Sequence, residues 1–277
     1  MDKCYNFQLN TFENAIFEKN IDATYIIHLV NNGRIENIKN QISKYKTTKK
    51  IYILNNLGFK NCKKKLFKQK TNYDLVDAFL KIFEHAKIMN YDNILILEDD
   101  FIIDNELKNI KNVYEIHNFL EKKKNKEFIY LLGTVPYNLI PYDIYNYKVP
   151  YSLGAHAVIY SKMLRNKIIQ LNKDKIDDWD KLFTGYKNKY CFYKPLIYQL
   201  FTDTDNSKNW ASITNYFNIK KNKLDNINLK YFKFLNMDKN PVIGFHLHYN
   251  LCKIYYYLLV LILIVLLYYI FISIKIK

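Results

Sequence analysis

Three consecutive carboxylates, Glu98, Asp99 and Asp100, interrupt an apolar stretch near the middle of this 277-residue chain. They follow the aliphatic residues 94–97 directly, so they stand where a short strand would end. Adjacent acids are costly to bury without a compensating cation, because desolvation costs several kcal/mol or neutralises the carboxylate. Hard oxygen ligands suit Mg²⁺ or Mn²⁺ carrying a substrate phosphate. The pattern predicts a metal and phosphate site, with a solvated acidic loop as the alternative.

The elements that must position these acids alternate between strand and helix patterns. Strands are expected at 24–30, 51–54, 93–97, 128–132 and 155–160, and a final strand at 242–248. Helices are expected at 35–45, from a possible cap at Asn72 through 75–86, and from Lys162 onward. Such alternation predicts an α/β fold with a mainly parallel sheet flanked by helices, which places the three acids at a carboxyl edge where ligands bind.

A second informative pattern lies at 254–274, where 21 residues include no charge and only one serine. At about 1.5 Å per residue this stretch spans a hydrocarbon core of roughly 30 Å. Tyrosines near both ends of the stretch and the lysines that flank it are typical of the two membrane–water interfaces. We expect a single transmembrane helix, with a buried core helix as the alternative. Residues 1–20 carry no apolar core typical of a secretory signal, so the large domain is expected on the cytosolic side, tail-anchored.

The composition adds weaker constraints. The net charge is +16, and lysines cluster at 60–65, 122–124 and 220–223. Attraction to anionic headgroups or a solvated face would explain these clusters, and no motif for binding nucleic acid accompanies them. The four cysteines match no metal or redox spacing, so ordinary thiols in a reducing compartment are expected. The excess of Lys, Asn, Ile and Tyr is typical of an AT-rich genome, viral or microbial.

Several motifs follow one another in a recognisable order. They are TYIIHLVNNGR, NYDNILILEDDFIID, FIYLLGT, GAHAVIYSK, IDDWDKLF and YKPLIYQLFTDTD. In this order the chain resembles glycosyltransferase family 25, which contains lipooligosaccharide and collagen galactosyltransferases. The resemblance covers about residues 25–205. It implies a Rossmann-like GT-A fold, dependence on Mn²⁺ or Mg²⁺, a UDP-sugar donor and inversion at the anomeric carbon.

The resemblance also implies roles for individual residues. Asp100 would hold the metal, and Glu98 and Asp99 would support the metal shell or the ribose. Asp177 would be the base that deprotonates the acceptor, with Asp178 and Asp180 as neighbours, although acids also favour helix starts. Binding of the nucleotide sugar would involve the following residues: Arg34, Glu98, Asp99, His156 and Gln199.

Two histidines extend the candidate metal site by analogy with other GT-A enzymes. His246 and His248 would face one side of the expected strand, and His246 could be a third metal ligand. A pair of surface histidines near the membrane is the alternative. His156 could equally be a hydrogen-bonded core histidine, and Arg34 a solvated turn residue.

We therefore expect an N-terminal segment (1–20), a GT-A-like domain (21–250) and a transmembrane helix (254–274). The expected activity is transfer of a hexose, such as galactose, from a UDP-sugar to a saccharide or protein hydroxyl. The reaction would take place at a cellular or virion membrane. Two alternatives remain open. One is a metal-dependent phosphohydrolase or nucleotidyltransferase, and the other is an inactive relative that serves as a membrane or virion scaffold.

Overall fold

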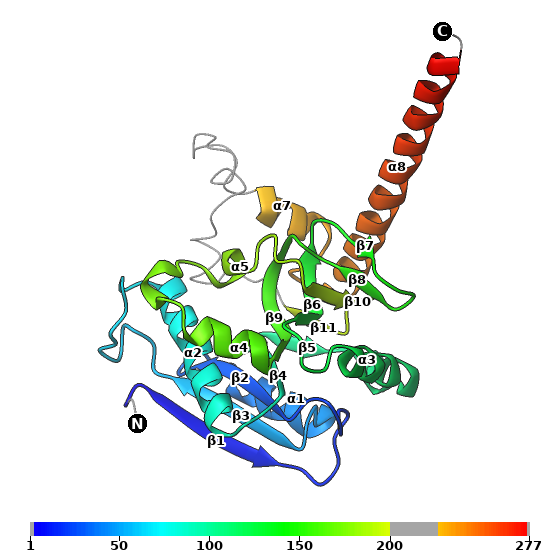
Figure 1. The fold of residues 1–277 in the computed structure, drawn as a ribbon. Helices are drawn as coiled ribbons and strands as arrows, with labels where there is room; N and C mark the ends of the chain where they lie inside the picture. The colour runs from blue at the N-terminus through cyan, green and yellow to red at the C-terminus, as the bar shows by residue number, and fades with distance from the viewer. Residues whose placement is uncertain (1–2, 200–226, 276–277) are drawn as a thin grey trace.

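The computed structural model describes residues 3–199 and 227–275 as an α/β fold built on one large mixed sheet (Figure 1). In sheet order its strands are β1 (Tyr5–Thr11), β3 (Lys50–Asn56), β2 (Ala23–Leu29), β4 (Asn93–Glu98), β9 (Ser152–Ser161), β6 (Ile129–Pro136), β10 (Lys189–Phe192), β8 (Asn146–Lys148) and β7 (Ile140–Pro141). A second sheet pairs β5 (Phe101–Ile103) with β11 (Ile197–Gln199).

Helices cover both faces of the large sheet, because successive strand residues point to opposite sides. One core contains β-strand residues such as Tyr25 and Ile96 with α2 (Thr71–Ile88), α4 (Lys162–Ile169) and α5 (Trp179–Leu182). The other contains Ile26 and Leu97 with α1 (Ile35–Tyr45) and α3 (Ile110–Lys122). Short 3-10 turns lie at Asn105–Lys108 and Lys173–Lys175. The α/β class predicted from the sequence is confirmed.

The sheet is not mainly parallel, and that prediction is wrong. In the described residues only β2–β3, β2–β4 and β6–β10 pair in parallel. Strand β9 lies antiparallel between β4 and β6. The chain reaches β9 from β6 through the short β7–β8 hairpin, without the helical crossover that a parallel partner requires.

Individual elements match the sequence patterns to different degrees. Helix α1 begins and ends where the pattern placed it, and β4 extends the expected strand by one residue. Asn72 is not the cap of α2, since the helix begins at Thr71 and Lys70 occupies the capping position without a side-chain bond. The N-terminal segment is not separate from the domain. It contributes β1, which pairs along its whole length with β3.

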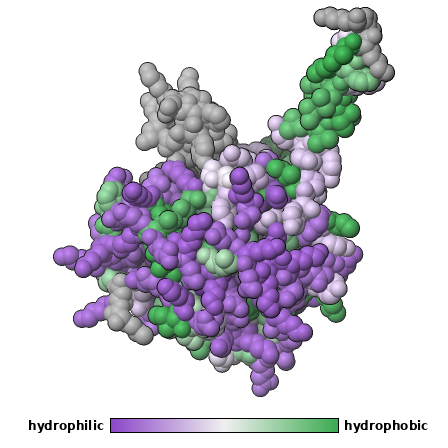
Figure 2. Space-filling model, in the orientation of Figure 1, coloured by the Kyte–Doolittle hydropathy of each residue, from purple (hydrophilic) through white to green (hydrophobic). Residues whose placement is uncertain are grey.

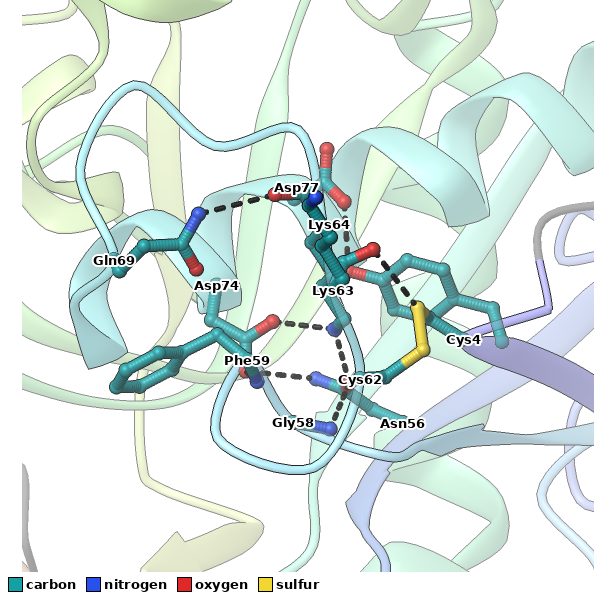
Figure 3. Close-up of a disulfide and its surroundings, with 11 residues drawn as sticks. Cys4, Asn56, Gly58, Phe59, Cys62, Lys63, Lys64, Gln69, Asp74 and Asp77 are labelled. Carbon is teal, nitrogen blue, oxygen red and sulfur yellow. Dashed lines mark hydrogen bonds and ion pairs between the residues drawn. A yellow bond between two sulfur atoms is a disulfide. The ribbon is translucent and has the colours of Figure 1, made fainter.

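A disulfide joins Cys4 to Cys62, which contradicts the expectation of four free thiols (Figure 3). The pairing of Tyr5 with Asn56 brings the start of β1 beside the loop that follows β3, and this proximity cannot be read from sequence spacing. Cys191 and Cys252 are buried thiols. Because disulfides persist in oxidising environments, cysteine usage no longer supports a cytosolic domain.

Two of the lysine clusters are partly structural. Lys64 is buried and contacts Asp74 and Asn56 (Figure 3). Lys123 donates to the hydroxyls of Tyr142 and Tyr190, at 3.0 and 2.9 Å. These two amines are therefore occupied within the domain and do not face a lipid headgroup. Residues 220–223 lie outside the described part of the chain.

The strand predicted at 242–248 is instead the first part of a long helix, α8 (Pro241–Lys275). A short apolar run does not distinguish a strand from a buried helix, and Pro241 suits the first helical position. The side chains of Phe245, His248, Tyr249 and Cys252 are buried at helical spacing. His246 and His248 consequently lie on different faces, because two residues along a helix correspond to about 200° of rotation.

Farther along, the same helix leaves the domain, and every side chain from Leu258 to Phe271 is exposed (Figures 1 and 2). The segment Pro241–Ile274 is long and apolar enough to cross a membrane, and none of its most apolar stretch is buried in the protein. Figure 2 shows this part of α8 as a mainly hydrophobic projection from a largely hydrophilic domain. The docked and exposed parts form one uninterrupted helix about 52 Å long.

We predict that removing residues 254–277 leaves a folded, soluble domain, whereas removing residues 241–277 prevents cooperative folding. The longer deletion removes Phe245 and Tyr249 from the core, and each buried aromatic contributes about 3–5 kcal/mol to a total stability of about 5–15 kcal/mol. Circular dichroism melts of both truncated chains test this difference. A sharp, near-identical melt for the two would show that the docked part of α8 is dispensable.

Candidate functional site

The three acids lie at the carboxyl ends of two neighbouring parallel strands, where the sequence placed them. Strand β4 ends at Glu98, and Ile27 of β2 is its partner across the ladder. The turn after β2 therefore passes beside Asp99 and Asp100. This edge is the usual ligand-binding position in open α/β sheets.

Asp99 is fully engaged in holding this turn. Its Oδ2 accepts from the Leu29 amide at 3.1 Å, and its carboxylate also bonds Asn32 and the Arg34 guanidinium. Burial acts to raise the pKa of Asp99, but the His28 ring, with Nδ1 3.6 Å away, and Arg34 outweigh it and lower the pKa. Asp99 is thus a stable anion that fixes Arg34 at the site.

Asp100 is different, because one of its oxygens is buried without a hydrogen-bond partner. That atom is Oδ1, whereas Oδ2 accepts from Gln199 Nε2 at 3.1 Å and lies 3.4 Å from Arg34 Nη1. Burial raises the pKa of Asp100 to about 6, although Arg34 acts in the opposite direction. Desolvation and repulsion by Asp100 and Asp180 raise the pKa of Glu98 well above its ordinary value. The acids at this edge would together carry more negative charge than the single positive charge of Arg34 can balance.

The structure separates the three acids predicted as the base. Asp180 faces the site, since its Oδ2 accepts from the Gly154 amide at 2.9 Å and its charge acts on Glu98. Asp178 caps α5 by accepting from the Lys181 amide at 3.0 Å. Asp177 is more than half exposed, with its Oδ2 3.3 Å from Lys181 Nζ.

Lys189 is a charged neighbour of this group that the sequence patterns did not reveal. It lies on β10 with only 3% of its surface exposed. Burial lowers the pKa of its amine to about 8, while the charge of Asp180 opposes this shift. A lysine in a short mixed strand gives no sequence signal of burial.

His156 lies in the centre of β9, next to Ala157, which pairs with Leu97 of β4. Its Nε2 is 3.3 Å from the Ile197 carbonyl oxygen, and its buried Nδ1 has no partner. Burial lowers the pKa of His156 to about 4, so the ring is neutral at physiological pH.

Two glycines that the motifs contained, but whose role was not foreseen, allow this packing. A Cβ at Gly133 would lie 1.8 Å from the Ile197 oxygen and 2.6 Å from His156 Nε2. Gly154 has φ +81°, and a Cβ there would lie 2.9 Å from His156 Nδ1. Only glycine leaves room for β11 and His156 at this edge.

His246 does not join the acids as the predicted third metal ligand. Because this segment is helical, its Nε2 lies 3.0 Å from the Tyr198 hydroxyl instead. His248 bonds Tyr231 and the Pro136 carbonyl, at 2.7 Å each. Within residues 3–199 and 227–275, no three His, Cys, Asp or Glu side chains are grouped as a metal cluster.

The acids nevertheless fit a divalent cation that is shared with a phosphate. The unpartnered Asp100 Oδ1 and the neighbouring Glu98 supply two carboxylates. Mg²⁺ and similar ions commonly bind through one or two carboxylates, with substrate phosphates and water completing the shell. The residues present are therefore compatible with the predicted metal, although it would lack a histidine ligand.

Sequence comparisons identify no family: no family model matches the chain, and neither does any curated protein. Solved structures give distant likenesses. A197 from STIV has a TM-score of 0.39 at 13% identity, over 66% of this chain and 87% of that one. Mannose-1-phosphate geranyltransferase from Thermus thermophilus has a TM-score of 0.37 at 10% identity, over 62% of this chain and 73% of that one.

A third solved structure is a glycosyltransferase involved in glycosylation of the major capsid of PBCV-1. Its TM-score is 0.30 at 14% identity, over 53% of this chain and 64% of that chain. These scores are too low to carry an argument about function. The resemblance to family 25 rests on the sequence motifs alone.

We predict opposite effects on stability for two neighbouring substitutions in the metal-free protein at pH 7.5. Asp100→Asn should stabilise it by about 1–3 kcal/mol, because a raised pKa means that the buried charge is unfavourable. Asp99→Asn should destabilise it by about 1–3 kcal/mol, because three donors lose an anionic partner. Denaturant unfolding of the full chain in detergent micelles measures both.

The pH dependence provides the control for Asp100. Between about pH 4 and pH 6 the folded state binds the Asp100 proton more tightly than the unfolded state does, so the stability contributed by this group falls as pH rises. The advantage of Asp100→Asn should therefore shrink between pH 7.5 and pH 5. An advantage that stays constant over this range would show that Asp100 is not a strained acid.

Proposed function

We propose that this protein is a membrane-anchored, metal-dependent glycosyltransferase that moves a hexose from a UDP-sugar to a saccharide or protein hydroxyl, with inversion. The observation that carries the proposal is the partnerless Asp100 Oδ1 beside Glu98, at the carboxyl end of a central strand. The order of the family 25 motifs supports the choice of sugar transfer among reactions that use a metal phosphate.

The chemistry of the donor explains this arrangement. Cleavage of the bond between an anomeric carbon and a nucleotide diphosphate leaves negative charge on the phosphates. Glu98 and Asp100 would hold Mn²⁺ or Mg²⁺, which supplies Lewis-acid stabilisation of that charge when bound. Asp99 would keep Arg34 oriented, so that the guanidinium can contact a donor phosphate as well as Asp100.

The acceptor hydroxyl must lose its proton as it attacks the opposite face of the sugar. Among the three predicted acids, Asp180 is best placed for this role, because it alone faces Glu98 and Gly154. Lys189 would place a positive charge close to this half-buried carboxylate, since the charge of Asp180 acts on the Lys189 amine. Asp178 would act as a helix cap, and Asp177 as a surface acid paired with Lys181.

The C-terminal helix supports the membrane component of the proposal. Its exposed apolar part begins where the domain ends, and Lys253 donates to the Tyr193 carbonyl at 2.7 Å at this boundary. A lysine and tyrosines at this position match the composition of a membrane interface. The acceptor would then be presented close to a membrane surface.

Binding of UDP by the full chain in detergent micelles tests the proposal. We expect Mn²⁺ and UDP together to raise the melting temperature, since ligands that bind the folded state stabilise it by mass action. Asp100→Asn should abolish the Mn²⁺-dependent part of the shift. Equal shifts in the wild type and Asp100→Asn would remove the proposed metal site, and the absence of any shift in the wild type would favour an inactive scaffold.

Product analysis separates sugar transfer from the competing chemistry. A glycosyltransferase releases UDP and transfers or slowly hydrolyses the sugar, whereas a nucleotidyltransferase transfers the nucleotide. We expect UDP as the nucleotide product from a UDP-hexose. Release of UMP, or a nucleotide joined to the acceptor, would identify the alternative enzyme class.

The base is tested by three matched substitutions to Asn, at Asp177, Asp178 and Asp180. Asp180→Asn should retain affinity for UDP while transfer falls by about 10² to 10⁴, the usual contribution of general base catalysis. Asp177→Asn and Asp178→Asn should both remain close to the wild type, because Asp177 is a surface acid and Asn caps a helix about as well as Asp. A larger loss of transfer at Asp177 than at Asp180 would return the assignment to the residue that the motif alignment favours.

A further inference from the structure

Gln199 donates a hydrogen bond to the carboxylate of Asp100, the proposed metal ligand. It lies on β11, a short strand with a single short partner strand. Strand β11 has only three residues, and it pairs with β5, which begins immediately after Asp100. Gln199 lies opposite Phe101, so its amide reaches Asp100 Oδ2 and leaves Oδ1 without a protein partner. A pair of three-residue strands is marginal alone, so other elements must fix the position of β11.

Helix α8 supplies that support through Tyr198. Successive strand residues face opposite sides, so Tyr198 points away from Gln199 and is fully buried. Its hydroxyl lies 2.7 Å from Asp104 Oδ2, to which it donates, and 3.0 Å from His246 Nε2. With its single proton used on Asp104, the hydroxyl oxygen accepts from a protonated Nε2 of His246.

Phe245, the preceding residue of α8, contacts the same region from the adjacent face. Its ring centroid is 5.5 Å from that of Tyr198 and 5.6 Å from that of His156, both edge to face. One turn of the helix therefore contacts both β11, which carries Gln199, and β9, which carries His156. The close approach of β11 to Gly133 leaves β11 between β6 and α8.

We propose that Phe245 and His246 are positioning residues for the metal and nucleotide site, acting through Tyr198 on Gln199 and Asp100. The inference rests on the proposed function and extends it to the membrane helix. The docked part of α8 forms the wall behind the site, so the element that anchors the protein also sets the geometry of Asp100. His246 would contribute to metal affinity without being a ligand.

The chain offers a closely matched control in His248. It lies on the same helix, is buried, and makes two hydrogen bonds of 2.7 Å, but its partners are Tyr231 and Pro136. Neither partner belongs to β11. Loss of either histidine removes hydrogen bonding at the surface where α8 meets the domain, whereas only loss of His246 should disturb Gln199.

The experiment is calorimetric titration of UDP with Mn²⁺ into full-length variants in detergent micelles. We expect His246→Ala and Tyr198→Phe each to weaken binding roughly 10- to 100-fold, the range for groups that orient metal ligands. His248→Ala should bind within about threefold of the wild type, although it loses a similar hydrogen-bonding contribution to stability. His246→Gln, whose amide can still donate to Tyr198, should recover most of the affinity.

The possible outcomes distinguish failure of the proposed function from failure of the positioning role. If the wild type does not bind UDP with Mn²⁺, the proposed function fails and this inference fails with it. If the wild type binds but His246→Ala and His248→Ala are equally affected, or neither is affected, the positioning role is wrong while the function stands. A loss at His246 that Gln does not restore, with Tyr198→Phe unaffected, would make His246 a direct ligand.

A second readout follows β11 itself. Hydrogen exchange in the Tyr198 and Gln199 amides should become faster in His246→Ala and remain unchanged in His248→Ala, because only the first loses the contact that holds this strand. Equal protection in both variants would contradict the proposed coupling.

Discussion

Several negative charges lie close together at the end of β4, and the structure around them depends on how these charges are compensated. Asp99, Asp100 and Asp180 all act on Glu98, and Asp99 is stabilised by donors from Leu29, Asn32 and Arg34. Arg34 contacts both Asp99 and Asp100 and cannot balance the whole group. Burial and, to a smaller extent, repulsion by the neighbouring acids raise the pKa values of Glu98 and Asp100, and a bound cation would lower them. Perturbed carboxylates of this kind are typical of functional sites.

The packing around these acids maintains the charge imbalance. Gly133 and Gly154 admit β11 and His156 so closely that an added Cβ at either glycine would clash with them. Neutral His156 adds no positive charge, and Gln199 satisfies one oxygen of Asp100 only. The packing therefore keeps these acids close together, and the docked part of α8 contacts the same packing through Phe245 and His246.

Parts of this arrangement could be predicted because their signals are local. The helix at Ile35–Tyr45 has strong apolar periodicity, and β4 is an aliphatic run that ends in charges. The remaining features depend on long-range contacts. The Cys4–Cys62 bond spans 58 residues, β9 is antiparallel because of the hairpin before it, and His246 is helical because α8 continues into the apolar segment. The preference for Asp180 over Asp177 likewise depends on which side of a four-residue helix faces β9.

The central claim is that Asp100 and Glu98 hold a divalent cation, and the most direct test is a crystal structure of the protein with Mn²⁺ and UDP, measured for anomalous scattering. We expect a manganese peak about 2.1 Å from Asp100 Oδ1, close to the distance typical of Mg²⁺, with Glu98 and a diphosphate oxygen in the same shell. A UDP complex without manganese at Asp100, or manganese bound only at another site, would contradict it.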